Sequence, residues 1–237
     1  MTPMKYRSDV TVELVKASAT DSDVATAARV STIGASHERV VDLERDEGLI
    51  NYLMRDRHGS PFEHTSLTFY VEAPIFVARE HFRHRAGWSY NEESGRYKEL
   101  QPVFYVPGSD RRLVQVGRPG AYEFVHGSDA HHARALSNMA LAYSEAYDAY
   151  QDMIKGGIAK EVARMVLPVG VFTSYYATCN ARSLMHYLAL RTKSEYAKFP
   201  SFPQREIEMV AAKMEDHLAE LMPITHEAYQ RNGRVAP

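Results

Sequence analysis

The chain has 237 residues, enough for a large domain with a full hydrophobic core. Its 45% hydrophobic and 24% charged residues are ordinary for a globular protein, and a formal charge of −2 gives no general attraction to nucleic acid or anionic membranes. The single cysteine excludes an internal disulfide framework. Because no stretch has the pattern of a signal peptide or the length of a transmembrane helix, we expect a cytoplasmic protein.

The first sixty or so residues predict one strand and two helices. Weak alternation of apolar and polar side chains indicates a strand over residues 10–15. Asp21 or Ser22 can cap a helix over residues 24–31. Apolar residues at i, i+3 and i+4 spacing then predict a helix over residues 42–56.

The middle of the chain begins with the clearest strand. Strict alternation over residues 65–72 predicts a strand with one buried face. Pro74 suits the first turn of a helix over residues 75–84, which would deliver a cluster of charged side chains to a loop. A short strand over residues 103–106 and a connection over residues 107–120 follow.

A long Ala-rich stretch predicts helix over residues 122–155, with an interruption near Gly127. We expect its tyrosines to pack in the core or between subunits rather than to bind a cofactor. A further helix over residues 158–167 contains Arg164, and β-branched and aromatic side chains predict a strand over residues 169–178.

The last part of the chain predicts two helices. Asn180 can cap a helix over residues 181–190, and a long helix over residues 204–221 should end before Pro223, followed by a short tail. Few strands mixed with longer helices, without regular alternation, favour an α+β fold. No linker or repeat divides the chain, so we expect one domain over residues 1–237.

The most unusual stretch, residues 83–97, reads RHRAGWSYNEESGRY. Its arginines suit bidentate capture of phosphate or carboxylate. An exposed charged loop is the alternative, since charge clusters are usually solvated. A solvated run would have no use for Gly87, Trp88 and Gly95 at its centre, which favours an anion site for a nucleotide.

Arg83-His84-Arg85, a spacer and then Ser94-x-Arg96 resemble the signature of the flavin-dependent thymidylate synthases. The spacer of eight residues is one longer than the family's usual spacer, a thermodynamically mild change in a loop. The resemblance extends over nearly the whole chain. It implies a single α+β catalytic domain with a central, mostly antiparallel sheet packed with long helices.

The resemblance also implies the reaction. Deoxyuridine monophosphate (dUMP) would be reductively methylated to dTMP, with methylenetetrahydrofolate as carbon donor and FAD, reduced by NADPH, as hydride source. No cysteine nucleophile would be needed, which agrees with our interpretation of Cys179, at the end of an apolar strand, as a buried inert thiol. The family further implies a homotetramer with shared active sites, and no nucleic-acid or membrane partner.

By resemblance, the flavin-binding residues are Ser60, Arg83, His84, Arg85, Glu92, Asn180, Arg182 and His186. Those for the nucleotide are Glu80, Arg83, Glu92, Glu93, Ser94, Gly95, Arg96, Arg164 and Arg191. Arg191 would be catalytic, stabilising charge at N3 of the uracil ring. His58 and Tyr97 are candidates for folate contacts from position alone.

The residues themselves support several of these assignments and leave alternatives open. A helix that starts at Asn180 offers free N–H groups and a partial positive charge to an anion, although an ordinary N-cap looks the same. Arg191 could instead pair with the dipole of its own helix, and Arg164 could be a snorkelling surface arginine.

Two other functions compete with the enzyme. His81 and His84 stand at helical spacing, with His58, Glu63 and His64 upstream, so a zinc site is conceivable, although neighbouring Arg side chains would oppose a cation. Interleaved Arg, Tyr and Trp also suit single-stranded RNA. The glutamates among them and the acidic net charge oppose that function.

Overall fold

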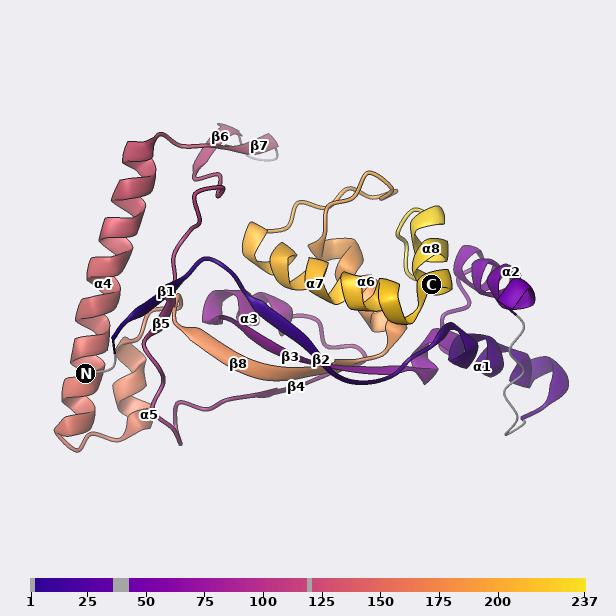
Figure 1. Cartoon of the computed structure of the whole chain (residues 1–237), viewed down its shortest axis with the longest axis horizontal. Helices are drawn as coiled ribbons and strands as arrows, with labels where there is room; N and C mark the ends of the chain where they lie inside the picture. The colour runs from indigo at the N-terminus through magenta and orange to yellow at the C-terminus, as the bar shows by residue number, and fades with distance from the viewer. Residues whose placement is uncertain (1–2, 36–42, 119–120) are drawn as a thin grey trace. The chain divides into compact units, whose positions relative to one another are not determined.

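The computed structural model describes residues 3–35, 43–118 and 121–237 (Figure 1). The chain divides into two compact units, each assembled from separate stretches of sequence. Unit 1 comprises Met1–Val10, Glu72–Arg79 and Glu92–Thr173. Unit 2 comprises Thr11–Val71, Glu80–Asn91 and Ser174–Pro237. The single domain expected from the sequence stays a prediction.

A four-stranded sheet, most of whose residues belong to unit 2, has the strand order β2-β3-β8-β4. Its members are β2 (Thr11–Ser18), β3 (Ser66–Pro74), β8 (Phe172–Cys179) and β4 (Trp88–Glu92). The first three confirm predicted strands. As the alternation in β3 predicts, Leu67, Phe69 and Val71 are fully buried.

Strand β4 lies where the sequence predicts only a loop. The preceding helix α3 (Ile75–His81) also ends earlier than residue 84, the predicted end. Trp88 is buried, and its ring is nearly parallel to that of Tyr90, with the ring centroids 5.7 Å apart. The Gly- and Asn-containing sequence looks like a turn, whereas pairing with β8, eighty residues later, makes this stretch a strand.

Two helices cover one face of this sheet within unit 2 (Figure 1). Helix α6 (Ala181–Arg191) and helix α7 (Arg205–Leu221) confirm the two predicted helices near the end of the chain. Both helices bury a full apolar stripe, which comprises Leu184, Met185, Leu188, Ile207, Val210, Met214 and Leu218. Burial of these side chains is the main stabilising term for this part of unit 2.

Unit 2 also contains three further α-helices, α1 (Asp21–Ile33), α2 (Leu43–Arg55) and α8 (Pro223–Arg231), and a 3₁₀ helix, η1 (Ser60–His64). The first two confirm predicted helices, although Asp42, the predicted start of the second, lies outside the described residues. Helix α8 lies where the sequence predicts only a short tail. Pro223 ends α7 as predicted but also occupies the first turn of α8, where proline is well tolerated.

The cap of α1 differs from the prediction. Thr20, rather than Asp21 or Ser22, is the N-cap, and it forms a capping box with Asp23. The buried carboxylate of Asp21 instead accepts hydrogen bonds at the start of α8, from N of Ile224 at 3.0 Å and from N and Oγ1 of Thr225 at 2.8 and 2.6 Å. The first helix therefore supplies the N-terminal cap of the last one.

We expect Asp21→Ala to lower the free energy of unfolding by about 2 kcal/mol, because α8 loses its cap and the buried Thr225 hydroxyl loses its acceptor. Urea unfolding followed by circular dichroism would measure the change. Asp21→Asn, which keeps one acceptor oxygen, should be less destabilised. An Asp21→Ala protein as stable as wild type would show that water replaces the cap.

Unit 1 is organised around helix α4 (Asp129–Lys155), which begins at the N-cap Ser128 close to the predicted interruption. Strand β1 (Lys5–Arg7) pairs in parallel with β5 (Val103–Tyr105), the strand predicted over residues 103–106. The tyrosines of α4 pack in the core, as expected. The cluster comprises Phe104, Tyr143, Tyr147, Tyr150, Ala163 and Val171.

Three predictions in unit 1 are wrong. Residues 114–118, predicted as part of a connection, form a strand. Residues 122–125 form strand β7 (Ala121–Val125), antiparallel to β6 (Val114–Arg118), instead of the first turns of the long helix. Residues 119–120 of the predicted connection lie outside the described residues. The helix expected over residues 158–167 is two short pieces, α5 (Lys160–Ala163) and the 3₁₀ helix η2 (Arg164–Val166).

Within the described residues, no helix is both long enough and apolar enough to cross a membrane.

Candidate active site

The predicted site residues fall into two groups, one in each unit. Unit 2 holds Ser60, Glu80, Arg83, His84, Arg85, Asn180, Arg182, His186 and Arg191. Unit 1 holds Glu92, Glu93, Ser94, Gly95, Arg96 and Arg164. Each group has its own local geometry.

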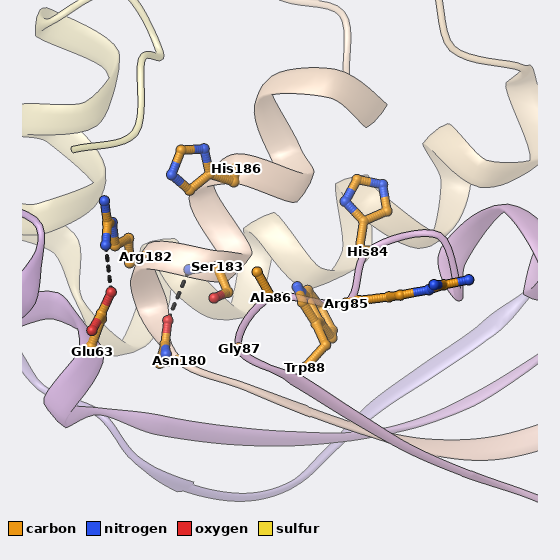
Figure 2. A pocket seen from close by; sticks show the side chains of 10 residues that line it. All are labelled: Glu63, His84, Arg85, Ala86, Gly87, Trp88, Asn180, Arg182, Ser183 and His186. Atoms are coloured by element: carbon orange, nitrogen blue, oxygen red, sulfur yellow. Dashed lines mark hydrogen bonds and ion pairs between the residues drawn. The ribbon is translucent and has the colours of Figure 1, made fainter.

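A cavity of about 440 Å³ lies in unit 2, between the start of α6 and the loop that leads into β4 (Figure 2). Five predicted flavin-site residues line it: His84, Arg85, Asn180, Arg182 and His186. Sequence reasoning did not assign the other five to this site: Glu63, Ala86, Gly87, Trp88 and Ser183. Ser60, Glu80, Arg83 and Arg191 are not among its lining residues.

The start of α6 is held by two side-chain caps. Oδ1 of Asn180 accepts from N of Ser183 at 2.8 Å, as the predicted N-cap requires. The backbone N of Ala181 donates to Oγ1 of Thr65 at 2.9 Å. These bonds fix the first turn of the helix, and one turn further along His186 follows Arg182.

Two nitrogens of the Arg182 side chain form contacts with other residues. Its Nε donates to the backbone oxygen of Pro237 at 2.6 Å, and its Nη1 forms an ion pair with Glu63 (Figure 2). Burial lowers the pKa of His186, and the nearby charges of Arg182 and Arg57 lower it further. The neutral form of His186 is therefore favoured beside the Arg182 guanidinium, although a hydrogen bond with the backbone of Pro237 opposes this shift of the pKa.

The opposite wall is the loop before β4, which approaches α6 very closely. Gly87 has a φ of +69°, and a Cβ built on it would lie 2.0 Å from Oγ of Ser183. Both the backbone conformation and the close approach require glycine there. Figure 2 shows Arg85 extending away from Asn180 and Arg182. The exposed Arg85 therefore contributes to the rim of this cavity.

Arg191, at the end of α6, lies between two partners. Nη1 contacts Oε2 of Glu80 at 2.7 Å, and Nε donates to Nε2 of His84 at 3.1 Å. Since an arginine has no acceptor, Nε2 of His84 must carry the lone pair and its ring must be neutral. Burial, together with the charge of Arg191, lowers the pKa of His84 to about 4.

Burial raises the pKa of Glu80, and the buried carboxylate of Glu206 adds to this effect while Arg191 opposes it. Desolvation therefore disfavours the ionised form of Glu80, whereas attraction to Arg191 favours it. The predicted alternative for Arg191, pairing only with the dipole of its own helix, does not describe this arrangement, because both side-chain partners come from the α3 end and the loop after it.

His81, which sequence reasoning considered as a metal ligand, is a core residue. It is fully buried, and its Nδ1 lies 3.0 Å from the hydroxyl of Tyr175. Burial lowers its pKa to about 3. Its ring stacks on that of Tyr187 at 4.7 Å. Across the part of the chain that the structure describes, no group of three or more His, Cys, Asp or Glu side chains could hold a metal ion.

The lowered pKa values of His81 and His84 predict how the free energy of unfolding depends on pH. Unfolded His81 and His84 bind protons below about pH 6.5, whereas the folded rings stay neutral to about pH 3 and 4. Because the unfolded state then binds more protons, the free energy of unfolding should fall as pH drops from 6.5 to 4. Urea unfolding at pH 7 and 4.5 should show a smaller acid loss for His84→Asn than for wild type. Equal losses would mean that His84 titrates normally in the folded protein.

In unit 1, a tight turn gathers three of the predicted nucleotide contacts. Oγ of Ser94 accepts from N of Arg96 at 3.3 Å. A Cβ built on Gly95 would lie 3.0 Å from Cδ1 of Leu100 and 3.2 Å from Cδ of Arg164, so the glycine backbone packs directly against these side chains. The turn thus brings Ser94, Gly95 and Arg164 close together.

The remaining predicted residues of unit 1 have protein partners. Nε of Arg96 lies 3.0 Å from Oε2 of Glu161 on the surface. Glu93 pairs with Lys98, and Oε1 of Glu92 accepts from Oγ1 of Thr173 at 2.6 Å. An anion that binds Arg96 would have to compete with Glu161. The Arg96–Glu161 ion pair is exposed and therefore contributes little free energy.

Cys179 is buried, as predicted. Burial raises the pKa of its side chain well above the ordinary value, so the reactive thiolate is disfavoured.

The chain is similar to proteins of one known family. Residues 13–224 match the family model described as "Thymidylate synthase complementing protein". A flavin-dependent thymidylate synthase of Streptomyces avermitilis is 66% identical over 234 residues, which cover 98% of this chain and 95% of that protein. One of Tropheryma whipplei strain TW08/27 is 53% identical over 234 residues, covering 98% of this chain and 97% of the relative.

A solved structure agrees. The UMP/dUMP methylase PolB of Streptomyces cacaoi, bound with 5-Br dUMP, superposes with a TM-score of 0.93 at 53% identity, covering 99% of this chain and 100% of that chain. This match confirms the predicted α+β fold type. With the family model and these relatives matched over nearly all of its sequence, the chain belongs to the family of flavin-dependent thymidylate synthases.

Proposed function

We propose that this protein methylates dUMP to dTMP, with methylenetetrahydrofolate as carbon donor and FAD, reduced by NADPH, as cofactor. The family membership supports the reaction class. The structural observation that supports it best is Arg191, a permanently charged guanidinium that is only 16% exposed and is held by Glu80 and by neutral His84.

The cavity in unit 2 fits part of a flavin dinucleotide. Its volume is within the usual range of about 300–1,000 Å³ for small-molecule sites. Arg182 and the start of α6 suit a phosphate, and Trp88 supplies apolar surface. Asn180, Arg182, His186 and His84 would hold the cofactor, with Ser60, Arg83, Arg85 and Glu92 as further contacts. When bound, the flavin supplies hydride-transfer chemistry.

The chain's own part in the reaction is to bind, orient and polarise the nucleotide. Negative charge develops on the pyrimidine ring when its carbon becomes nucleophilic, and Arg191 would stabilise that charge from a fixed position in a partly desolvated site. His84 cannot compete as a second cation, because burial and Arg191 keep it neutral. Glu80 holds the guanidinium and would also lie beside the nucleotide.

We propose that the turn at residues 94–96 in unit 1 binds the phosphate of the nucleotide. Ser94 offers a hydroxyl, Gly95 a backbone N–H, and Arg96 and Arg164 offer guanidinium groups. Charge-assisted bonds from Arg to phosphate are about twice as strong as neutral hydrogen bonds. Glu92 and Glu93 would contact the nucleotide from the same stretch. His58 and Tyr97 stay candidates for folate.

We also propose a homotetramer with shared active sites, located in the cytoplasm and without nucleic-acid or membrane partners. Exposed apolar side chains on and around η2, such as Met165 at 76%, offer surface for subunit contacts. Light scattering of the purified protein would give the oligomeric state directly.

A second candidate substrate is UMP. The solved relative PolB, bound with 5-Br UMP in one structure, is described as a UMP/dUMP methylase and is 52% identical to this chain. Discrimination between the two nucleotides would depend on contacts to the ribose 2′-hydroxyl. Equal rates with UMP and dUMP would identify the protein as a dual methylase.

The decisive experiment combines colour with isotope release. The purified protein should absorb in the visible flavin bands, and it should release tritium from dUMP labelled at carbon 5 only when methylenetetrahydrofolate and NADPH are present. A colourless preparation that does not bind added FAD would overturn the proposal. Formation of dTMP without methylenetetrahydrofolate would remove folate as the carbon donor.

A further inference from the structure

Residues 234–237, which follow α8, contact a side chain that lines the cavity. The backbone oxygen of Pro237 accepts from Nε of Arg182 at 2.6 Å. One residue earlier, the oxygen of Ala236 accepts from Nη1 of Arg57 at 3.2 Å. Ala236 and Arg234 are buried. The segment is therefore built into unit 2, and two of its backbone oxygens face two arginines.

Arg234 anchors this segment. Its Nη2 lies 2.8 Å from Oε2 of Glu215 and donates to Oγ1 of Thr192 at 2.6 Å, while its Nη1 pairs with Oε1 of Glu215. The guanidinium also lies 4.9 Å from the ring centroid of Tyr229. These contacts hold Arg234 at a φ of +55°, a conformation that side-chain-bearing residues rarely adopt.

The effect on Arg182 follows from the shape of its side chain. A guanidinium is planar, and its five N–H donors form a rigid fork. Pro237 engages Nε and Glu63 engages Nη1. Among the described residues, Nη2 has no acceptor. Two fixed nitrogens determine the plane of the fork, so Nη2 is the nitrogen left for an incoming anion.

Gly59 leaves the room that this arrangement needs. A Cβ built on it would lie 2.4 Å from Nε of Arg182 and 2.8 Å from the oxygen of Pro237. Its backbone, at φ −79° and ψ −26°, is one that any residue adopts. Glycine is thus required at this position by the close approach of Arg182 and Pro237, not by the conformation of the chain.

We propose that Gly59 and residues 234–237, anchored by the buried Arg234–Glu215 ion pair, are positioning elements for Arg182 and set its free edge toward the phosphate of a bound dinucleotide. This inference rests on the proposed role of Arg182 in binding the flavin cofactor. It adds residues outside the recognised motif, none of which is among the residues that line the cavity.

The test measures the dissociation constant of FAD by fluorescence titration of flavin-free protein. Gly59→Ala should weaken FAD binding about tenfold or more, because the new methyl group displaces Arg182. The matched control is Gly48→Ala, in α2, where an added Cβ meets nothing within 4 Å, and its affinity should equal that of wild type.

A double-mutant cycle separates positioning from a general packing defect. In an Arg182→Ala background the clash with the guanidinium disappears and only the close contact with the oxygen of Pro237 remains. With no guanidinium left to displace, Gly59→Ala should change the FAD dissociation constant less than twofold. If Gly59→Ala does not fold, Arg234→Lys, which keeps the charge but loses the bidentate geometry, takes its place in the same cycle. An expected threefold or greater loss should again vanish without Arg182.

The outcomes distinguish this inference from the proposed function. If wild type binds FAD and Gly59→Ala binds it equally well, or if the loss is the same with and without Arg182, the positioning role is overturned and the enzyme assignment stands. If wild type does not bind FAD at all, both are overturned.

Discussion

Arg191→Ala is expected to lower the rate of methyl transfer by about 10³-fold while leaving the flavin bound. The guanidinium lies between Glu80 and His84, at the far end of α6 from Asn180 and Arg182. Because it does not line the unit 2 cavity, its removal should spare cofactor affinity. Tritium release from labelled dUMP measures the reaction, and flavin absorbance of the same sample measures cofactor content.

Two further variants serve as comparisons for Arg191→Ala. Arg191→Lys keeps a charge but cannot reach both partners with fixed geometry, so it should recover only part of the rate. Arg55→Ala, which removes an exposed arginine paired with its neighbour Asp56, should leave the rate unchanged. If Arg191→Ala instead loses its flavin, Arg191 belongs to cofactor binding and the catalytic assignment is wrong.

Glu215→Ala is expected to lower the free energy of unfolding by about 3–5 kcal/mol, because it leaves a buried arginine without its counter-charge. The side chain of Arg234 is 3% exposed and that of Glu215 is 15% exposed. Burial by itself raises the pKa of Glu215, yet hydrogen bonds from Arg234 and His226 overcome this and lower it to about 2. Urea unfolding at pH 7 gives the loss.

The exposed pair Arg231–Glu227 provides the control, since Glu227→Ala should cost no more than about 1 kcal/mol. The double variant Glu215→Leu with Arg234→Met should be more stable than Glu215→Ala alone, because it leaves no charge buried. A loss below about 1 kcal/mol for Glu215→Ala would show that water reaches Arg234 and solvates it.

Local patterns predicted the elements whose signal is carried by neighbouring residues. The strict alternation of β3 and the Asn180 cap of α6 are visible in a few neighbouring residues, and the structure has both. The arginine-rich stretch indicated the family through residue types alone. Those signals do not depend on where the rest of the chain lies.

The errors occur where distant partners decide the local structure. Strand β4 depends on pairing with β8, and strands β6 and β7 depend on pairing with each other. Asp21 looked like the cap of its own helix, but its carboxylate caps α8, about two hundred residues later. Propensity is a weak prior that tertiary contacts override.

By itself, the sequence determined the α+β class, most helices and strands, and the chemistry of the candidate residues, because side-chain type and short-range periodicity carry that information. Only the tertiary structure decided which of those residues meet: Glu80 and His84 at Arg191, and Pro237 with Glu63 at Arg182. The physical reason is that the pKa values and orientations of these groups come from burial and from charges contributed by remote segments, which no local pattern encodes.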